Sequence, residues 1–364
     1  MQRQLLPALL VVAVLGGLPA CGHPDQPPAP TPTPLAEELV FYNWPDYMPQ
    51  AALDDFEAAY GVRVNYVTYQ SQEEAAARIS AGQVDFDVAV IEYEMLPHLV
   101  ERDLLARIDY RQVPNFKHIA ADFRDLAFDP GNQYLAPYNW GTTGLLVRGD
   151  LVAEPVTRWA DLWDERYAGQ VAVRSHQLEL IAVALKSLGY SANSEDPGQL
   201  EAAQERLLRL RPSLFFVDVE SPSATAQLLD GAAVLMVGWP GDALYAQGHN
   251  PAISYVLPEE GSMLWGDGFV ISAKSTRKHT AEVFINYVLR PEVSAQIVEQ
   301  YYYATANEAA LALIDPDIRD NPTIFPPRAD IRKAEWYLPL SPEGQRLRDQ
   351  VWQRFLSATP QEER

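Results

Sequence analysis

The chain has 364 residues and a formal net charge of -21, and its length is sufficient for two folded domains. A single cysteine excludes an intramolecular disulfide and a cysteine-rich metal site. The 28 basic residues form no run or patch, which argues against a nucleic-acid partner, whereas the 49 acidic residues favour the approach of cations.

The N-terminal segment has the pattern of an export signal. Arg3 gives a positive start, Leu5 to Leu18 form an apolar stretch too short to span a bilayer, and small residues lead to Cys21. The sequence Leu-Pro-Ala-Cys at 18–21 resembles the lipobox of bacterial lipoprotein signal peptides. This resemblance implies a signal peptide at 1–20, a lipid on Cys21 and anchoring at the periplasmic face of a membrane. The proline-rich residues 21–36 predict a tether before the folded body.

The first part of the body alternates strand and helix patterns. Pro49 near the start and Gly61 just past the end are typical of a helix bounded on both sides. We expect strands at 39–42, 62–69 and 87–91, and helices at 49–60, 72–81 and 96–105. This order is typical of a mostly parallel sheet that helices cover on both faces.

An aromatic and acidic turn joins the first predicted strand to the first helix. Trp44, Asp46 and Tyr47 fall on it, at the rim of an open α/β sheet where ligands bind. Two rings beside a carboxylate suit an organic cation, while the alternative is an aromatic turn that closes the sheet edge. Glu92 and Glu94 follow the third predicted strand near the same rim, and we interpret Glu94 as a solvated loop carboxylate.

The middle of the chain repeats the α/β pattern after a crossing point. Residues 134–147 predict a strand, a bend and another strand, and we place the first crossover to a second lobe near Thr142 or Thr143. Beyond it we expect a short helix at 159–163, strands at 171–173, 214–217 and 231–237, and helices at 177–188 and 197–210. The chain then returns through an apolar run at 269–272 and helices at 280–289, 291–299, 307–314 and 342–355.

Tryptophan and aspartate recur together at predicted strand or turn boundaries. Trp239 precedes Asp242 in a Trp-Pro-Gly-Asp turn, and Trp265 precedes Asp267 in a Trp-Gly-Asp sequence. With the turn after the first strand, this makes three such pairs, which packing alone explains poorly.

These patterns predict an α/β fold of two lobes, each a mostly parallel sheet flanked by helices. We assign residues 37–142 plus 267–311 to one lobe and residues 143–266 plus 312–364 to the other. Because more than one crossover joins the lobes, the fold predicts a ligand cleft between them that closes by a hinge motion.

Six motifs together resemble the bacterial extracytoplasmic polyamine-binding proteins, which are the spermidine/putrescine receptors of ABC importers. They are Phe-Tyr-Asn-Trp-Pro-Asp-Tyr at 41–47, Pro-Tyr-Asn-Trp-Gly at 137–141, Val-Thr-Arg-Trp-Ala-Asp-Leu-Trp at 156–163, Leu-Gly-Tyr-Ser at 188–191, Trp-Gly-Asp at 265–267 and Leu-Arg-Pro-Glu-Val at 289–293. The resemblance implies a type II periplasmic-binding fold and a monomer that passes a polyamine to an ABC permease, without catalysis, cofactor or metal. It implies ligand-binding roles for Trp44, Asp46, Tyr47, Glu179, Trp239, Asp242, Trp265, Asp267 and Tyr303.

The sequence departs from the pattern of this family at several ligand positions. Glu92 stands where the family usually has a serine, and His176 stands where spermidine-type members carry a second acid. Pro45 replaces a small hydroxyl residue, and Tyr337 falls near a frequent polar contact. These changes leave the exact polyamine open. Glu92 either supplies a further acid for a longer or more highly charged ligand or pairs with His176 across the cleft.

Other functions stay open from the residues alone. The same receptor can serve a membrane sensor, such as a diguanylate cyclase or phosphodiesterase, instead of an importer. Adjacent tyrosines at 301–303 suggest a ferric-ion receptor, although three tryptophan-acid pairs have no role in an iron site. His176 and Glu179 have metal-ligand spacing but no third partner. Paired acids suggest glycoside hydrolysis, but no catalytic motif accompanies them.

Overall fold

The computed structural model describes residues 33–217 and 223–358. The predicted signal peptide, residues 21–32 of the predicted tether and Cys21 lie outside the described residues. Within the described ranges, none of the helices combines the length and the apolar character that crossing a membrane requires.

The first group of strands follows the predicted alternation closely. Its elements are β1 (Glu38–Asn43), α1 (Gln50–Tyr60), β2 (Arg63–Thr68), α2 (Gln72–Ser80), β3 (Val88–Glu92), η1 (Tyr93–Met95), α3 (Leu96–Glu101) and β4 (Leu105–Ala106). Strand β1 lies between β2 and β3 and pairs with both in parallel. Gly61 ends α1 in the left-handed conformation and donates its N–H to the Glu57 carbonyl. The predicted helix at 96–105 was too long, because α3 ends at Glu101 and the chain then forms β4.

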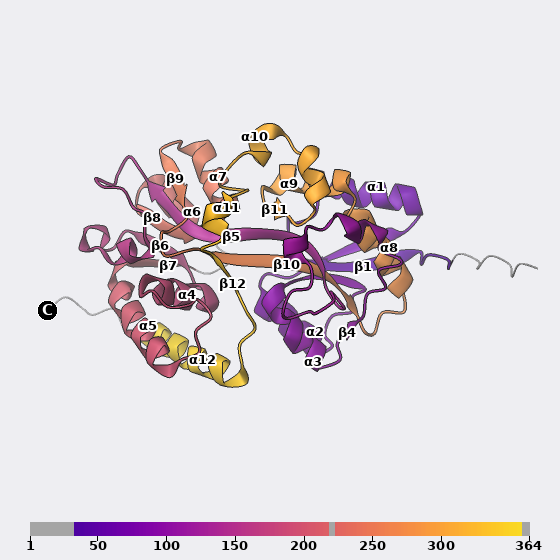
Figure 1. Ribbon diagram of the computed structural model, residues 1–364, viewed down its shortest axis with the longest axis horizontal. Helices are drawn as coiled ribbons and strands as arrows, with labels where there is room; N and C mark the ends of the chain where they lie inside the picture. The colour runs from indigo at the N-terminus through magenta and orange to yellow at the C-terminus, as the bar shows by residue number, and fades with distance from the viewer. Residues whose placement is uncertain (1–32, 218–222, 359–364) are drawn as a thin grey trace, which may run out of the picture. The chain divides into compact units, whose positions relative to one another are not determined.

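Two long strands, β5 (Ala136–Arg148) and β10 (Met263–Ser272), run through the centre of the sheet (Figure 1). They are antiparallel to each other, and β10 is also antiparallel to β3. Up to Thr143, β5 pairs with β10, and from Gly144 onward it pairs with β8 and β9. The predicted bend within 134–147 is absent from this continuous strand, which changes partner at the crossover predicted near Thr142 or Thr143.

The second group of strands is only partly parallel. Its elements are β6 (Val171–Arg174), α4 (Gln177–Ser187), α5 (Pro197–Leu210), β7 (Leu214–Val217), α6 (Ser223–Asp230), β8 (Leu235–Gly238), α7 (Pro240–His249) and β9 (Ile253–Val256). Strand β6 lies between β7 and β8 and pairs with both in parallel, whereas β9 pairs with β5 in antiparallel orientation. Two boundary predictions were wrong here: Trp239 precedes a helix rather than a turn, and Trp265 and Asp267 lie inside β10.

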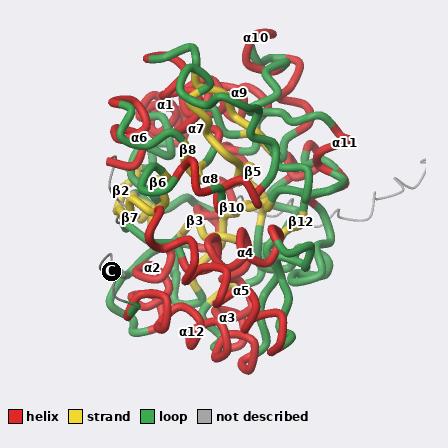
Figure 2. Tube along the Cα trace, turned by 90° about the vertical axis from the view of Figure 1, so that its left-hand side faces the viewer, coloured by secondary structure: helices red, strands yellow, loops and turns green. Residues whose placement is uncertain are grey.

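Helices cover both faces of the strands (Figure 2). Alternating residues of a strand point to opposite faces, so Leu145 packs in a core with α4, α5 and α12 (Pro342–Ser357), whereas Leu146 packs with α6 and α7. In the first group, Phe41 packs towards α1 and α8 (Lys278–Val288), and Tyr42 packs towards α2 and α3. The sheet is thus buried on both faces, as its apolar strands predict.

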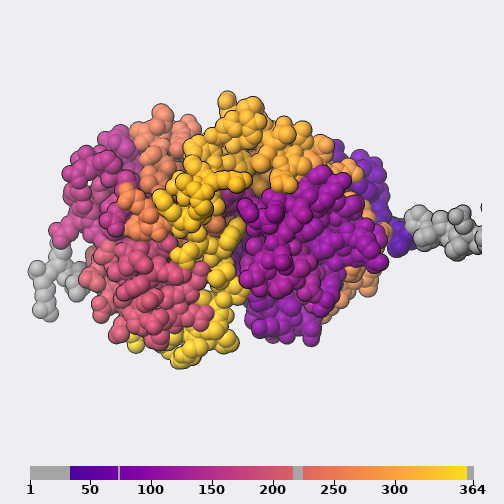
Figure 3. Space-filling model, in the orientation of Figure 1, coloured from indigo at the N-terminus to yellow at the C-terminus, as the bar shows by residue number. Residues whose placement is uncertain are grey.

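The C-terminal part returns across both groups of strands. It contains α9 (Pro291–Tyr301), β11 (Ala304–Thr305), η7 (Glu308–Ala312), α10 (Pro316–Arg319), α11 (Arg328–Ile331) and β12 (Glu335–Trp336) before α12. In Figure 3 this segment, coloured orange to yellow, runs along the top of the view and then down between the purple and the magenta-to-red surfaces. Ile314, Ile318 and Phe325 pack with α9. The predicted lobe boundary at 311–312 separates these residues from α9, and this boundary stays a prediction.

The remaining short turns are 3-10 helices: η2 (Pro114–His118), η3 (Ala121–Phe123), η4 (Trp159–Trp163), η5 (Glu165–Tyr167) and η6 (Arg211–Ser213). The helices predicted at 159–163 and 307–314 are 3-10 turns of this kind rather than α-helices.

Candidate functional site

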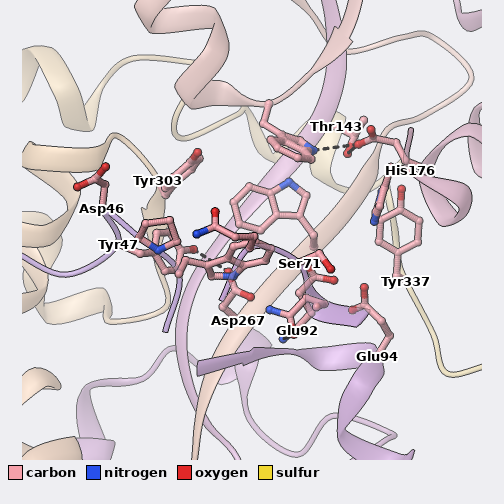
Figure 4. Close-up of a pocket in the computed structure, with 17 residues that line it drawn as sticks. Asp46, Tyr47, Ser71, Glu92, Glu94, Thr143, His176, Asp267, Tyr303 and Tyr337 are labelled. Carbon is pink, nitrogen blue, oxygen red and sulfur yellow. Dashed lines mark hydrogen bonds between the residues drawn. The ribbon is translucent and has the colours of Figure 1, made fainter. Parts of the chain in front are cut away.

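A cavity of about 320 Å³ opens where strand ends from both groups meet (Figure 4). Its lining holds five carboxylates, one imidazole and six tryptophan or tyrosine rings, and the described lining residues include no lysine or arginine. The lining residues are Trp44, Pro45, Asp46, Tyr47, Gln70, Ser71, Gln72, Glu92, Glu94, Thr143, His176, Glu179, Trp239, Trp265, Asp267, Tyr303 and Tyr337.

Asp267 is one of two deeply buried carboxylates in this lining, with 4% of its surface exposed. The Tyr47 hydroxyl donates a hydrogen bond of 2.6 Å to its Oδ2, while its Oδ1 has no hydrogen-bond partner among the described residues. Burial raises the pKa of Asp267 to about 7, with the hydrogen bond from Tyr47 opposing this rise and the negative charge of Glu94 adding to it. One oxygen of this buried, cavity-lining acid therefore has no hydrogen-bond partner among the described residues.

Aromatic rings form a wall beside Asp267. Trp265 meets Tyr303 edge to face, with ring centroids 5.4 Å apart, and Tyr303 meets Tyr47 in the same way at 5.6 Å. Trp265 lies against the backbone of Gly141, where a Cβ would come within 2.2 Å of its ring. Trp44 packs on Tyr69 at 4.8 Å. Because each ring rests on a neighbour, the wall is held in place before any ligand arrives.

Glu179 supplies a second buried carboxylate from another part of the fold. It lies in the first turn of α4, is 2% exposed, and its Oε1 accepts hydrogen bonds of 2.9 Å from the Thr143 hydroxyl and the Trp239 indole. A helix N-terminus favours negative charge, so this position suits an acid. Glu179 also fixes the plane of Trp239, since the indole N–H points at it.

Asp242 is the one predicted site residue that lies outside the cavity lining. Arg174 donates to both of its oxygens, at 2.7 and 2.9 Å, and the Arg174 guanidinium also lies 4.6 Å from the Trp239 ring centroid. The Trp239 backbone N–H donates a further bond to Asp242. Arg174 therefore matches the charge of Asp242, which also contacts the Trp239 backbone, and the ligand-binding role of Asp242 stays a prediction.

The other predicted residues lie at different depths in the lining. Asp46 is exposed and adopts a positive φ of 50°. Glu92 and His176 are half-buried, and the His176 Nδ1 has no hydrogen-bond partner among the described residues. Tyr337 is buried, and its pKa is raised well above the usual value by burial and then by the charges of Glu179 and Glu94.

The sequence interpretation missed several lining residues. Glu94 is not a solvated loop carboxylate, because the 3-10 turn η1 after β3 carries it into the lining, where it is half-buried. The position of Glu94 two residues after Glu92 was the sequence feature that could have indicated a place in the lining. Thr143, Gln70, Ser71 and Gln72 also line the cavity, and their polar character alone did not mark them.

The cavity chemistry suits an organic cation with apolar segments. Carboxylates pair with ammonium groups, and aromatic faces attract cations and pack on methylenes. Tyr301–Tyr303 do not gather there: Tyr303 lines the cavity, whereas Tyr302 is exposed at the left-handed end of α9. Within the described part of the chain, no group of three or more His, Cys, Asp or Glu side chains is arranged to hold a metal ion.

Comparison with known proteins gives related sequences over most of the chain. The spermidine/putrescine-binding periplasmic protein of Escherichia coli is 34% identical over 300 residues, which is 82% of this chain and 86% of that protein. The putrescine/agmatine-binding protein of Pseudomonas aeruginosa is 32% identical over 332 residues, which is 86% of this chain and 90% of that protein.

Solved structures confirm the predicted type II periplasmic-binding fold. The spermidine/putrescine ABC transporter substrate-binding protein of Streptococcus pneumoniae gives a TM-score of 0.79 at 29% identity, over 88% of this chain and 99% of that chain. A putative spermidine/putrescine ABC transporter protein of Listeria monocytogenes gives 0.82 at 29% identity, over the same shares of the two chains. Residues 51–326 match the family model described as bacterial extracellular solute-binding protein. The chain therefore belongs to the family of bacterial extracellular solute-binding proteins.

Proposed function

We propose that this protein captures a linear polyamine of the putrescine or spermidine class outside the cytoplasm and delivers it to an ABC importer. The observation that carries the proposal is Asp267, a buried acid with one unpartnered oxygen in an aromatic cavity whose described lining has no basic side chain except His176. The names of the relatives in Escherichia coli and Pseudomonas aeruginosa support the same ligand class.

Binding follows from the separation of charge and apolar surface in the cavity. A polyamine loses strong hydration on entry, and carboxylates must offset that loss by pairing with its ammonium groups. Asp267 and Glu179 lie on different elements, β10 and α4, so they can hold different amines of one chain. The rings of Trp265 and Trp239 both line the cavity and can pack on the methylenes between the amines.

We further propose that the protein works as a monomeric, lipid-anchored receptor on the periplasmic face of a membrane, without turning over its ligand. The proposal of an anchor rests on Cys21 and the apolar segment before it. The periplasmic location is supported by the named location of the Escherichia coli relative.

Titration calorimetry of the purified protein tests the ligand class. We expect saturable binding, one ligand per protein, for at least one of putrescine, cadaverine, spermidine, norspermidine and spermine. The uncharged diol 1,4-butanediol, which matches putrescine in length, is the control and should give no binding heat. Absence of binding by all five amines, or equal binding of the diol, would show that the proposed ligand class is wrong.

A further inference from the structure

The carboxylates of the cavity form a row rather than two isolated ends. In the antiparallel pairing of β3 and β10, Glu92 lies directly opposite Asp267. Residues opposite each other point to the same face, with Cβ atoms about 5 Å apart. Both side chains line the cavity, and Figure 4 shows them beside each other along one wall. The acid at the base of the cavity thus has a second acid next to it.

Glu94 extends this row towards Glu179. Its charge raises the pKa of Asp267 on one side and that of Tyr337 on the other, and Glu179 also acts on Tyr337. Its carboxylate therefore lies within electrostatic reach of both groups. In Figure 4 Glu94 lies on the same wall as Glu92, below Tyr337. The order along the cavity is Asp267 with Glu92, then Glu94, then Tyr337 and Glu179.

A row of acids sets a requirement on the charge of the ligand. A diamine pairs with carboxylates at two places, and between them it presents only methylenes. The diamine then offsets only part of the negative charge that Asp267, Glu92, Glu94 and Glu179 bring to the cavity, whereas a third ammonium offsets more of it. A chain with an internal secondary ammonium places a positive charge where the diamine has none. Discrimination therefore comes from rejecting the diamine as well as from holding the triamine.

We propose that Glu92 and Glu94 determine specificity by pairing with an internal ammonium, so that the protein prefers linear triamines and tetraamines to diamines. This inference rests on the proposed function, because it names the polyamine class that the same cavity takes. Asp267 supports it independently, since its buried Oδ1, which has no hydrogen-bond partner in the described part of the chain, can accept from a terminal ammonium at the end of the row.

Two ligands of the same length separate internal charge from size. Spermidine and 1,8-diaminooctane have the same number of chain atoms and the same primary amines, but the second has a methylene in place of the internal ammonium. By titration calorimetry, we expect the wild-type protein to bind spermidine at least about 30-fold more tightly, the effect of one well-placed charge pair. Putrescine should also bind more weakly than spermidine.

The double variant Glu92→Gln/Glu94→Gln tests whether these two residues cause the preference. We expect the ratio of spermidine to 1,8-diaminooctane affinity to fall to within about fivefold, mainly through weaker spermidine binding. Glu101→Gln is the control for the chemistry of the substitution, because it neutralises one carboxylate at an exposed position at the end of α3. That control should keep the wild-type ratio.

Each outcome bears on a different statement. If the wild-type protein binds spermidine and 1,8-diaminooctane equally, Glu92 and Glu94 do not select for internal charge. The same conclusion follows if the double variant keeps the wild-type affinity ratio. The wild-type affinity ratio alone shows whether the protein prefers an internal ammonium, even if the double variant does not fold. If no amine binds at all, the proposed polyamine function fails instead.

Discussion

Replacing Asp267 by asparagine separates the function of this residue from its effect on stability. The pKa of Asp267 lies at about 7 instead of the usual 3.8, so its ionised form is disfavoured in the empty cavity. At 1.36 kcal/mol per pKa unit, a rise of about three units means that the charged side chain destabilises the unliganded protein by about 4 kcal/mol above pH 7. Asparagine carries no charge and still offers an oxygen to the Tyr47 hydroxyl.

The sign of this effect depends on pH. A carboxyl group whose pKa is raised in the folded state contributes its full stability below the pKa of the unfolded state and loses it as pH rises towards 7. We therefore expect Asp267→Asn to stabilise the unliganded protein by up to about 4 kcal/mol at pH 8 and by little near pH 4. Urea unfolding at both pH values measures the difference, with the exposed-site variant Asp55→Asn as control.

The same substitution should weaken ligand binding. Removing one partner of a buried charge pair typically costs about 2 kcal/mol or more, which is about 30-fold in affinity. Calorimetry with spermidine at pH 8 measures this loss. A variant that is less stable than the wild type at pH 8, or that binds spermidine with unchanged affinity, would refute the account of Asp267.

One further measurement on the wild-type protein and two substitutions test the site. First, ligand binding should release about one proton at pH 6, because a bound ammonium favours the ionised form of Asp267. Calorimetry at pH 6 in two buffers of different ionisation enthalpy detects this proton, and equal binding heats in the two buffers would contradict its release. Second, Asp242→Asn should lower the free energy of unfolding by about 3 kcal/mol, because it leaves the buried guanidinium of Arg174 without its charge partner; urea unfolding measures this, and an unchanged midpoint would contradict it. Third, Gly141→Ala should displace the Trp265 ring and weaken spermidine binding at least about tenfold. Gly248→Ala, whose added Cβ meets open space, should leave the calorimetric affinity for spermidine unchanged. Equal effects of the two substitutions would contradict the role of the Trp265 ring in binding.

Much of the fold was predictable because its signals are local. The strand–turn–helix units around Trp44 and the first parallel strands follow from hydrophobic periodicity and from Pro and Gly at helix ends. The wall of the cavity was predictable for a related reason. Trp44 and Tyr47 follow the end of β1, on the side of the sheet where ligands bind, whereas Trp265 and Asp267 lie inside β10 and were marked by their recurrence as a tryptophan-acid pair.

What could not be predicted depends on contacts between distant segments. Asp242 stands close to Trp239 in the sequence, but its charge is matched by Arg174, 68 positions away. No local pattern reports that pairing. Glu94 enters the cavity because a 3-10 turn follows β3 at once, and a single sequence does not distinguish this turn from an exposed loop. The two-residue strands β4 and β12 likewise exist only through their pairing with β10.

A crystal structure of the protein with spermidine tests the central claim most directly. The account predicts one extended ligand in the cavity, with an amine nitrogen at hydrogen-bond distance from the Asp267 Oδ1, another near Glu179, and methylenes packed on the Trp265 ring. A ligand bound elsewhere on the surface, or one in the cavity that leaves Oδ1 without an amine, would contradict it.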